Sequence, residues 1–300
     1  MNQFREEIIG GQRLVLADCL DFLPTLPAAS FDTVLTDPPY PCIKRSYGTW
    51  TEAEWHAMMD VVVPQSRRVL KPTGSAVYIL QPNSEKVGRM RPWLWEFMAK
   101  WGREWGMVQD AWWWNTCSLP GAAASIFGLM RSSLKVCAWF GDATCYRAQG
   151  EVLWDESDYN RMAALEAKAG RVKSRSDAQS GHSVDNARCR SAASRRGGVT
   201  PFNILPIGNG AAKDATLGSH GASTPFALCD WWLRYICPPG GSVLEPFMGS
   251  GTVLVAAELQ GKTGVGCETV PEYFDIACRR VEEAVKKAEQ ERAQLTLEDA

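Results

Sequence analysis

The sequence predicts an α/β fold built on a doubly wound, mainly parallel sheet. Short apolar segments rich in β-favouring residues alternate along the chain with segments of helical periodicity, as in βαβ units. In addition, four of the expected strands end, or nearly end, on an acidic residue: Asp18, Asp37, Glu245 and Glu268. Because parallel strands end at one edge of a sheet, the sequence predicts that these acids converge on one ligand site.

The composition is that of a globular chain with room for one large domain and an insertion. Of its 300 residues, 45% are hydrophobic, and the net charge is −2. The chain contains no apolar run long enough to span a membrane, and its first residues lack the apolar core of a signal peptide. We therefore expect a cytoplasmic protein without membrane contact. The ten cysteines include no Cys-x-x-Cys pair, so no zinc site or disulfide framework is indicated.

The first predicted strand, Gln12–Asp18, leads into a short helical segment at Cys19–Leu23. Asp18 is suited to cap that helix, since its side chain can accept a backbone N–H group. A second segment, Phe31–Thr36, is short, largely apolar and β-favouring, and is therefore predicted to be a buried strand.

The segment Asp37-Pro38-Pro39-Tyr40 follows this buried strand and predicts a rigid lip. Two prolines stop the strand ladder and hold the backbone extended. The lip carries a carboxylate, carbonyl acceptors and an aromatic ring, which together suit a planar base with an exocyclic amino group. The structural alternative is a simple turn, because Asp-Pro dipeptides are common in turns.

A loop at 41–50 comes next, and its Lys44 and Arg45 are candidates for phosphate contact or for ordinary solvated charges. Thr51–Glu54 has the pattern of a capping box and predicts a helix with an apolar stripe. The strand Ser75–Leu80 follows this helix.

Glu85–Trp101 is predicted to be helical, and Met107–Trp114 and Leu134–Phe140 are predicted strands. Three consecutive tryptophans, at 112–114, suggest base stacking. Neighbouring residues of a strand point to opposite faces, however, so core packing is the favoured interpretation for each.

Residues 145–215 differ from the rest because their apolar periodicity fades. Between Arg171 and Arg196, seven basic residues face two acidic ones, which gives a local charge of seven minus two, or +5. A solvated loop is one interpretation. Binding of the DNA phosphate backbone is the preferred one.

The final third begins with a predicted helix from Pro225 to Cys237 and continues with a strand that ends at Glu245. Gly249 and Gly251 then form a turn in which the backbone can approach a ligand closely. No lysine follows Gly251, so the turn is not a P-loop. Another strand ends at Glu268, where an acid can accept ribose hydroxyl protons or favour the start of the next helix.

Taken together, Asp37-Pro38-Pro39-Tyr40 and the stretch Glu245–Thr252 resemble the two signatures of the DNA amino-methyltransferases that use S-adenosyl-L-methionine. The catalytic signature precedes the cofactor signature, as in the permuted β group of that family. The resemblance implies a seven-stranded Rossmann-like sheet with one antiparallel strand and a loop-rich insertion. It also implies two catalytic-domain halves at 1–144 and 216–286, a target-recognition region at 145–215 and a charged tail at 287–300, where we expect the chain to fray.

The resemblance assigns roles to individual residues. The catalytic residues are Asp37, Pro38, Pro39 and Tyr40. The cofactor-binding residues are Asp18, Thr224, Glu245, Pro246, Phe247, Gly249, Ser250, Gly251, Thr252 and Glu268. The expected DNA-binding residues are Lys44, Arg45, Arg171, Lys173, Arg175, Arg188, Arg190, Arg195 and Arg196. Thr224 stands where the family usually has a lysine.

The implied activity is methylation of adenine N6 in a specific DNA sequence, because Asp in the first motif position is the usual adenine form. Cytosine N4 is the alternative, and an inactive DNA-binding relative is another. RNA and protein amides also present planar amino groups, but the basic insertion favours double-stranded DNA. A cognate restriction endonuclease is a compatible partner, and the protein is expected to be a monomer or homodimer.

Overall fold

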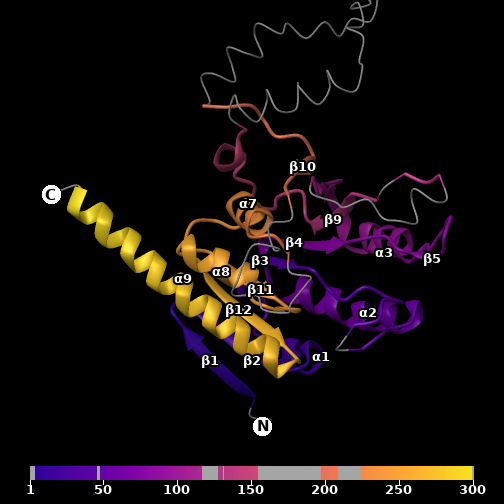
Figure 1. Cartoon of the computed structure of the whole chain (residues 1–300), viewed down its shortest axis with the longest axis horizontal. Coiled ribbons are helices and arrows are strands. Elements are labelled where there is room, and N and C mark those ends of the chain that lie inside the picture. The colour runs from indigo at the N-terminus through magenta and orange to yellow at the C-terminus, as the bar shows by residue number, and fades with distance from the viewer. Residues whose placement is uncertain are drawn as a thin grey trace, which may run out of the picture. The chain divides into compact units, whose positions relative to one another are not determined.

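The computed structural model describes residues 4–45, 48–116, 128–130, 132–154, 197–208 and 224–298. Among these residues, ten strands form one sheet in the order β1-β2-β12-β11-β3-β4-β9-β8-β10, and β7 pairs with β9 (Figure 1). The bounds are β1 Arg5–Ile9, β2 Gln12–Leu16, β3 Phe31–Thr36, β4 Leu70–Leu80, β7 Met107–Gln109, β8 Trp112–Trp114, β9 Leu134–Gly141, β10 Ile204–Pro206, β11 Ser242–Glu245 and β12 Thr263–Glu268.

The centre of the sheet is parallel, as the sequence predicts. The neighbours β2, β12, β11, β3 and β4 are all paired in parallel. The strand β1 is antiparallel to β2, and β9 is antiparallel to β4, β7 and β8. The described sheet therefore has more strands than the expected seven, and two of its strands, β1 and β9, run against the others.

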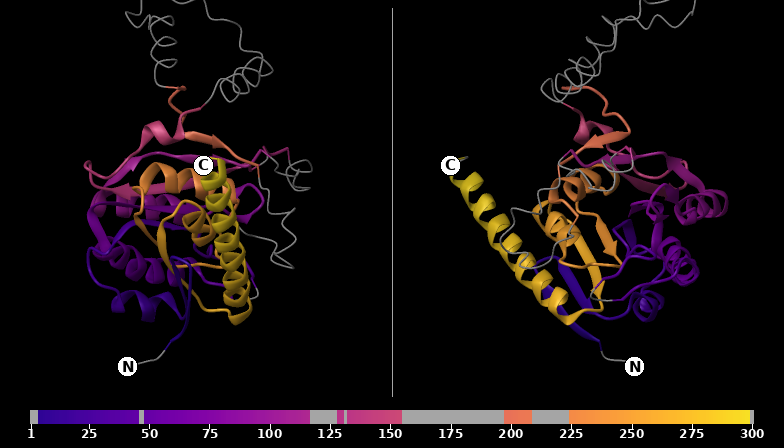
Figure 2. Two further views of the ribbon diagram at one scale, coloured as in Figure 1. Left: turned by 90° about the vertical axis from the view of Figure 1, so that its left-hand side faces the viewer. Right: turned by 45° about the vertical axis from the view of Figure 1, so that its right-hand side comes forward.

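Helices cover both faces of the sheet, so the fold is doubly wound (Figure 2). The helices on one face are α1 Cys19–Phe22, α2 Glu52–Val69 and α3 Trp93–Trp101. Those on the other are α7 Phe226–Ile236, α8 Thr252–Leu259 and α9 Pro271–Glu298. Successive strand residues alternate between the faces: Val34 and Tyr78 join the first core, whereas Leu35 and Val77 join the second.

The capping box that begins α2 is present, since Thr51 and Glu54 bond reciprocally. Within α2, Trp55, Met59 and Val62 are completely buried, so its predicted apolar stripe belongs to the core. Likewise Trp113 is only 2% exposed, which supports core packing for the middle residue of the three tryptophans.

Two expected elements differ from the structure. The first part of the predicted helix at Glu85–Trp101 is a hairpin, with β5 Ser84–Lys86 and β6 Arg89–Met90 joined through Gly88, whose φ is +79°. The helix begins only after Pro92, because proline has no backbone N–H group to donate to a preceding turn of helix.

The second difference is the charged tail, which does not fray after Lys286. Instead α9 continues to Glu298. Its last turns are rich in Glu, Lys, Ala, Gln and Arg, which are strong helix formers, and Lys287 pairs with Glu291 one turn later at 3.8 Å.

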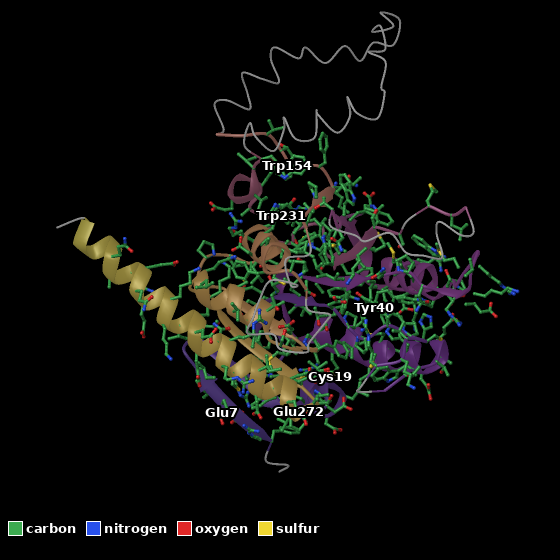
Figure 3. The ribbon with its side chains drawn as sticks, viewed as in Figure 1. Glu7, Cys19, Tyr40, Trp154, Trp231 and Glu272 are labelled. Carbon is green, nitrogen blue, oxygen red and sulfur yellow. The ribbon has the colours of Figure 1, made fainter. Side chains whose placement is uncertain are left out.

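The described residues 148–154 and 197–202 belong to a second unit, separate from the rest of the described chain. Within it, Trp154 and Val199 exchange backbone hydrogen bonds, and the Trp154 ring packs edge-on against Phe202. Figure 3 shows the side chains, including Trp154 of this unit, Glu7 on edge strand β1, and Cys19 and Tyr40 beyond the ends of β2 and β3. Among the described residues, no helix is both long and apolar enough to cross a membrane.

Candidate active site

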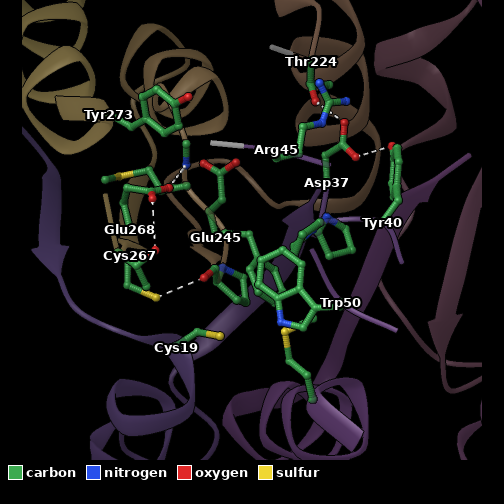
Figure 4. Close-up of a pocket in the computed structure, with 18 of the residues that line it drawn as sticks. Cys19, Asp37, Tyr40, Arg45, Trp50, Thr224, Glu245, Cys267, Glu268 and Tyr273 are labelled. Carbon is green, nitrogen blue, oxygen red and sulfur yellow. Dashed lines mark hydrogen bonds between the residues drawn. The ribbon is translucent and has the colours of Figure 1, made fainter. Parts of the chain in front are cut away.

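A cavity of about 760 Å³ lies at the carboxyl ends of β2, β3, β11 and β12. The four acids that follow or end these strands, Asp18, Asp37, Glu245 and Glu268, all line it. The structure thus joins the proline lip and the glycine turn, which are far apart in sequence, in one pocket (Figure 4). Such an edge of a parallel sheet is where α/β proteins bind ligands.

The Asp37 carboxylate is surrounded by hydrogen-bond donors from three elements. The Tyr40 hydroxyl donates to its Oδ1 atom. Its Oδ2 atom accepts from the Thr224 hydroxyl at 2.9 Å and from the Lys135 ammonium at 3.4 Å. Thr224, expected at the cofactor, therefore also contacts the carboxylate of the lip.

Hydrogen bonds and a ring contact from neighbouring side chains fix the proline lip. The Trp55 indole donates to the Pro39 carbonyl at 2.6 Å, and Asn83 donates to the Pro41 carbonyl at the same distance. The Tyr40 ring stacks on Trp93, with ring centroids 6.4 Å apart and planes 28° from parallel. These contacts hold the acceptors of the lip in place before any ligand arrives.

Glu268 organises the turn that follows β11. Its Oε2 atom accepts from the Gly249 N–H group at 2.8 Å, and its Oε1 atom accepts from the Val270 N–H group at 2.8 Å. Burial raises the pKa of Glu268, and these backbone donors oppose the rise. Glu268 therefore braces the turn and also holds the Val270 backbone directly before α9.

Glu245 is a buried carboxyl group, and among the described residues one of its oxygens accepts no hydrogen bond. It is 5% exposed, and within the described part of the chain its Oε2 atom has no hydrogen-bond partner. Burial raises the pKa of Glu245 well above its usual range, the nearby Glu268 raises it further, and Arg280 opposes the rise. An unsatisfied buried acceptor that lines a cavity suits a cationic or N–H donor from a ligand.

The glycine turn is supported by Arg280 of α9, which is only 8% exposed. Its Nη1 atom donates to the Ser250 carbonyl at 2.6 Å and to the Ser250 and Thr252 hydroxyls at 3.0 Å each. Ser250 and Thr252 line the cavity, but their hydroxyl groups accept hydrogen bonds from the helix behind the turn.

The two glycines of the turn serve different purposes. Both have left-handed backbones, with φ of +53° at Gly249 and +76° at Gly251. A Cβ atom at Gly249 would meet nothing within 4 Å, whereas one at Gly251 would lie 2.9 Å from the Ala277 Cβ atom. Gly249 lines the cavity, and Gly251 is required for the close approach of α9.

The remaining predicted residues divide into three groups. Asp18, Pro246 and Phe247 line the cavity, and Asp18 also caps α1 by accepting from the Leu20 N–H group. Arg45 lines the cavity near Asp37 and Thr224 (Figure 4), and Lys44 is exposed. The other expected DNA-binding residues, Arg171, Lys173, Arg175, Arg188, Arg190, Arg195 and Arg196, lie outside the described residues.

Several cavity residues were not predicted from the sequence: Trp50, Trp113, Lys135 and Tyr273 line the cavity, and Arg280 lies behind its turn. Lys135 carries the one detectable signal, since it is a charged residue near the start of an otherwise apolar strand segment. The others resemble ordinary core or helix residues.

Comparison with known proteins identifies the relatives of this chain. The model of the family N6_N4_Mtase, described as DNA methylase, matches residues 31–279. The type II methyltransferase M.PvuII of Proteus hauseri is 25% identical over 89% of this chain and 82% of its own length. The DNA adenine methyltransferase YhdJ of Escherichia coli is 23% identical over 94% of this chain and 86% of its own.

Solved structures show the same fold. The cytosine-N4-specific PvuII DNA methyltransferase has a TM-score of 0.70 and 19% identity, covering 95% of both chains. The Thermus thermophilus protein TTHA0409, complexed with S-adenosyl-L-methionine, has a TM-score of 0.57 and 18% identity, covering 91% of this chain and 95% of its own.

Proposed function

The chain belongs to the N6_N4_Mtase family of DNA methylases, and from this membership we propose that it methylates the exocyclic N6 amino group of adenine in a specific DNA sequence. The methyl donor of this family is S-adenosyl-L-methionine. The observation that carries the proposal is the shared cavity lined by both Asp37 of the proline lip and Gly249 of the glycine turn.

The lip supplies what a weakly nucleophilic aromatic amine needs. The lone pair of such an amine is delocalised into its ring, so transfer requires help from acceptors on the amino hydrogens. The Asp37 carboxylate and the Pro38 carbonyl are the proposed acceptors, since the Pro39 carbonyl already accepts from Trp55. They favour a pyramidal nitrogen, stabilise the positive charge that develops on it, and orient it, which is worth on the order of several kcal/mol.

The donor set of the cavity fits the proposed cofactor. When bound, S-adenosyl-L-methionine supplies an electrophilic methyl group on a sulfonium. The unpartnered Glu245 oxygen suits the ammonium group of its methionine part, and a Glu268 carboxylate suits its ribose hydroxyls. Gly249 leaves the turn without a side chain where the backbone must come close. Asp18 is the proposed acceptor for the adenine amino group of the cofactor.

A base paired inside a duplex cannot reach the lip, so we propose that the target base is flipped out of the helix. Flipping costs a few kcal/mol. Stacking on an aromatic ring at the lip recovers about 1–3 kcal/mol. Tyr40 is the proposed stacking partner, and its own stacking on Trp93 keeps the ring fixed.

Methylation of cytosine N4 is the second candidate. Two observations favour it: the relative with a TM-score of 0.70 is a cytosine-N4-specific enzyme, and Thr224 replaces the lysine usual in the family. Both amines are planar and can donate two hydrogens to the same acceptors. An Asp at position 37 supports adenine as the first candidate.

The type II methyltransferases among the relatives support a DNA substrate and a cognate restriction endonuclease as partner. We propose that the enzyme works in the cytoplasm. We propose that the enzyme acts on double-stranded DNA as a monomer or homodimer, with the basic segment around 171–196 contacting phosphates.

The experiment that tests the proposal is methylation of DNA of known sequence with methyl-labelled cofactor, followed by nuclease digestion and mass spectrometry of the nucleosides. N6-methyladenine is the expected product. N4-methylcytosine would replace the first candidate by the second, and labelled RNA or protein with unlabelled DNA would overturn both.

A further inference from the structure

Lys135 is a charged side chain inside the candidate active site that neither signature contains. It stands near the start of β9, opposite Trp113 of β8 in the antiparallel register. Its side chain is only 19% exposed, and it lines the cavity beside the Asp37 carboxylate. Lysine side chains are mostly exposed, so a largely buried lysine in a candidate active site indicates a specific role.

Aromatic rings hold the Lys135 ammonium group in place. Its Nζ atom lies 4.9 Å from the centroid of the Trp113 ring and 5.3 Å from that of the Tyr40 ring. Such cation–π contacts stabilise a partly buried charge without using up a carboxylate. The charge is therefore positioned by the walls of the cavity as well as by hydrogen bonds.

The hydrogen bonds of Lys135 place its donors beside the acceptor of the lip. The ammonium donates to the Tyr40 hydroxyl at 3.0 Å and, more weakly, to Asp37 Oδ2 at 3.4 Å. An ammonium group carries three N–H donors, and within the described residues these two oxygens are its hydrogen-bond acceptors. The site thus presents an acceptor, Asp37, and a donor, Lys135, side by side.

This acceptor–donor pair matches the Watson–Crick edge of adenine and of cytosine. In adenine the amino group on C6 lies next to N1, and in cytosine the amino group on C4 lies next to N3, and both ring nitrogens are acceptors. Guanine and thymine present the reverse order, a carbonyl acceptor next to an N–H donor. Enzymes that act on flipped bases read this Watson–Crick edge by hydrogen bonds.

We propose that Lys135 reads the target base by donating a hydrogen bond to the ring nitrogen next to the reactive amino group, N1 in adenine or N3 in cytosine. The inference rests on the proposed function, because it needs the amino group to lie at Asp37. It assigns to Lys135 the selection of adenine or cytosine over guanine and thymine, and to Asp37 the activation of the amine.

Replacement of a single base atom tests this contact. The substrates are duplexes that carry the enzyme's own target sequence, with adenine, 1-deazaadenine or 7-deazaadenine at the methylated position. With the natural enzyme we expect kcat/KM to fall about tenfold or more for 1-deazaadenine, since a hydrogen bond from a charged donor is lost. The 7-deaza base keeps N1 and serves as the control for altered stacking.

In Lys135→Met the loss should already be present with adenine, and the 1-deaza substitution should then cost little more. Lys135→Arg should restore most of the discrimination. Lys100→Met is the matched control, because Lys100 also lies over a tryptophan ring, 4.9 Å from its centroid, and pairs with an aspartate at 2.7 Å, but does not line the cavity. That variant should discriminate as the natural enzyme does.

Equal discrimination against 1-deazaadenine in the natural enzyme and Lys135→Met would overturn the proposal and leave Lys135 as a structural partner of Asp37. If the natural enzyme methylates cytosine, 3-deazacytosine replaces the 1-deaza base, and the same comparison decides. Failure of the natural enzyme to methylate any base would contradict the proposed function itself, and the two failures are thereby distinct.

Discussion

At the scale of single residues, the site contains two carboxyl groups in opposite situations. Asp37 is supplied with donors from Tyr40, Lys135 and Thr224. Glu245 is buried and lacks a partner for one oxygen among the described residues. Under the proposed function, Asp37 accepts from the reacting amine and Glu245 accepts a donor from the cofactor.

Replacing Asp37 should separate chemistry from binding. In Asp37→Ala, methyl transfer should fall by several orders of magnitude, because the main acceptor for the amine is gone. Cofactor affinity, measured by calorimetry, should stay within a few-fold. The isosteric Asp37→Asn keeps the volume but removes the charge and one acceptor oxygen. A comparable loss of cofactor binding in both variants would make Asp37 a structural residue.

Glu245 should make cofactor binding dependent on pH. Its pKa is raised in the free protein, mainly by burial, and an ammonium group bound beside it favours the ionised form. Binding therefore releases a proton, so affinity should rise with pH above the usual glutamate range and level off once Glu245 is ionised in the free protein. Titration calorimetry in buffers of different ionisation enthalpy measures both effects.

Glu245→Gln is the control for that titration, because it removes the ionisable group and keeps the shape. The pH dependence should disappear in this variant. The raised pKa also means that the free protein loses stability as pH rises through it, a loss that the variant should lack. A pH-independent affinity in the natural enzyme would contradict the assignment of Glu245.

At the scale of elements, α9 packs directly behind the glycine turn and supports it. Arg280 and Ala277 of α9 contact the backbone and hydroxyl groups of the turn. The sequence indicates the turn by its glycines and the helix by its periodicity. It does not indicate their contact, because a buried arginine on a helix face is identical in sequence to an exposed one.

The two glycines of the turn should respond differently to alanine. Gly251→Ala should destabilise the fold by about 1–3 kcal/mol, from a left-handed backbone and overpacking against Ala277. Gly249→Ala should lower the free energy of unfolding by about 1 kcal/mol, from the left-handed backbone alone. It should, however, weaken cofactor binding more than Gly251→Ala does. Thermal unfolding and calorimetry of both variants measure this. Equal stability losses with unchanged cofactor binding would contradict the division of roles.

The elements that the sequence predicts well are the buried parallel strands. Phe31–Thr36 is both a predicted and an observed strand with the same bounds, because all six residues are buried and most of them favour β structure. Edge strand β1 and the hairpin of β5 and β6 are exposed and have no such pattern. Lys135 was missed for another reason: its role depends on residues brought close by the sheet.

At the scale of the whole molecule, sequence and structure agree on a parallel sheet whose acids meet at one edge. The basic segment between Arg171 and Arg196 lies outside the described residues, so its role stays a prediction. Its charge of seven basic minus two acidic residues, or +5, contrasts with a net charge of −2 for the chain.

Neutralising Arg171, Lys173 and Arg175 to glutamine should weaken DNA binding and flatten its salt dependence, because fewer counterions are released from the DNA. Fluorescence anisotropy across a range of salt concentrations measures the slope. The same three changes should leave cofactor affinity unaltered. An unchanged slope of DNA affinity against salt concentration would mean that the segment does not contact DNA phosphates and is a solvated loop.

We propose that one cavity holds the methyl donor at the glycine turn and directs its methyl group toward the proline lip. A crystal structure of the protein with S-adenosyl-L-methionine would show where the donor lies. We expect its ammonium group at Glu245, its ribose at Glu268 and its sulfonium methyl group facing Asp37. A cofactor bound elsewhere, or with its methyl group turned away from Asp37, would rule out this arrangement.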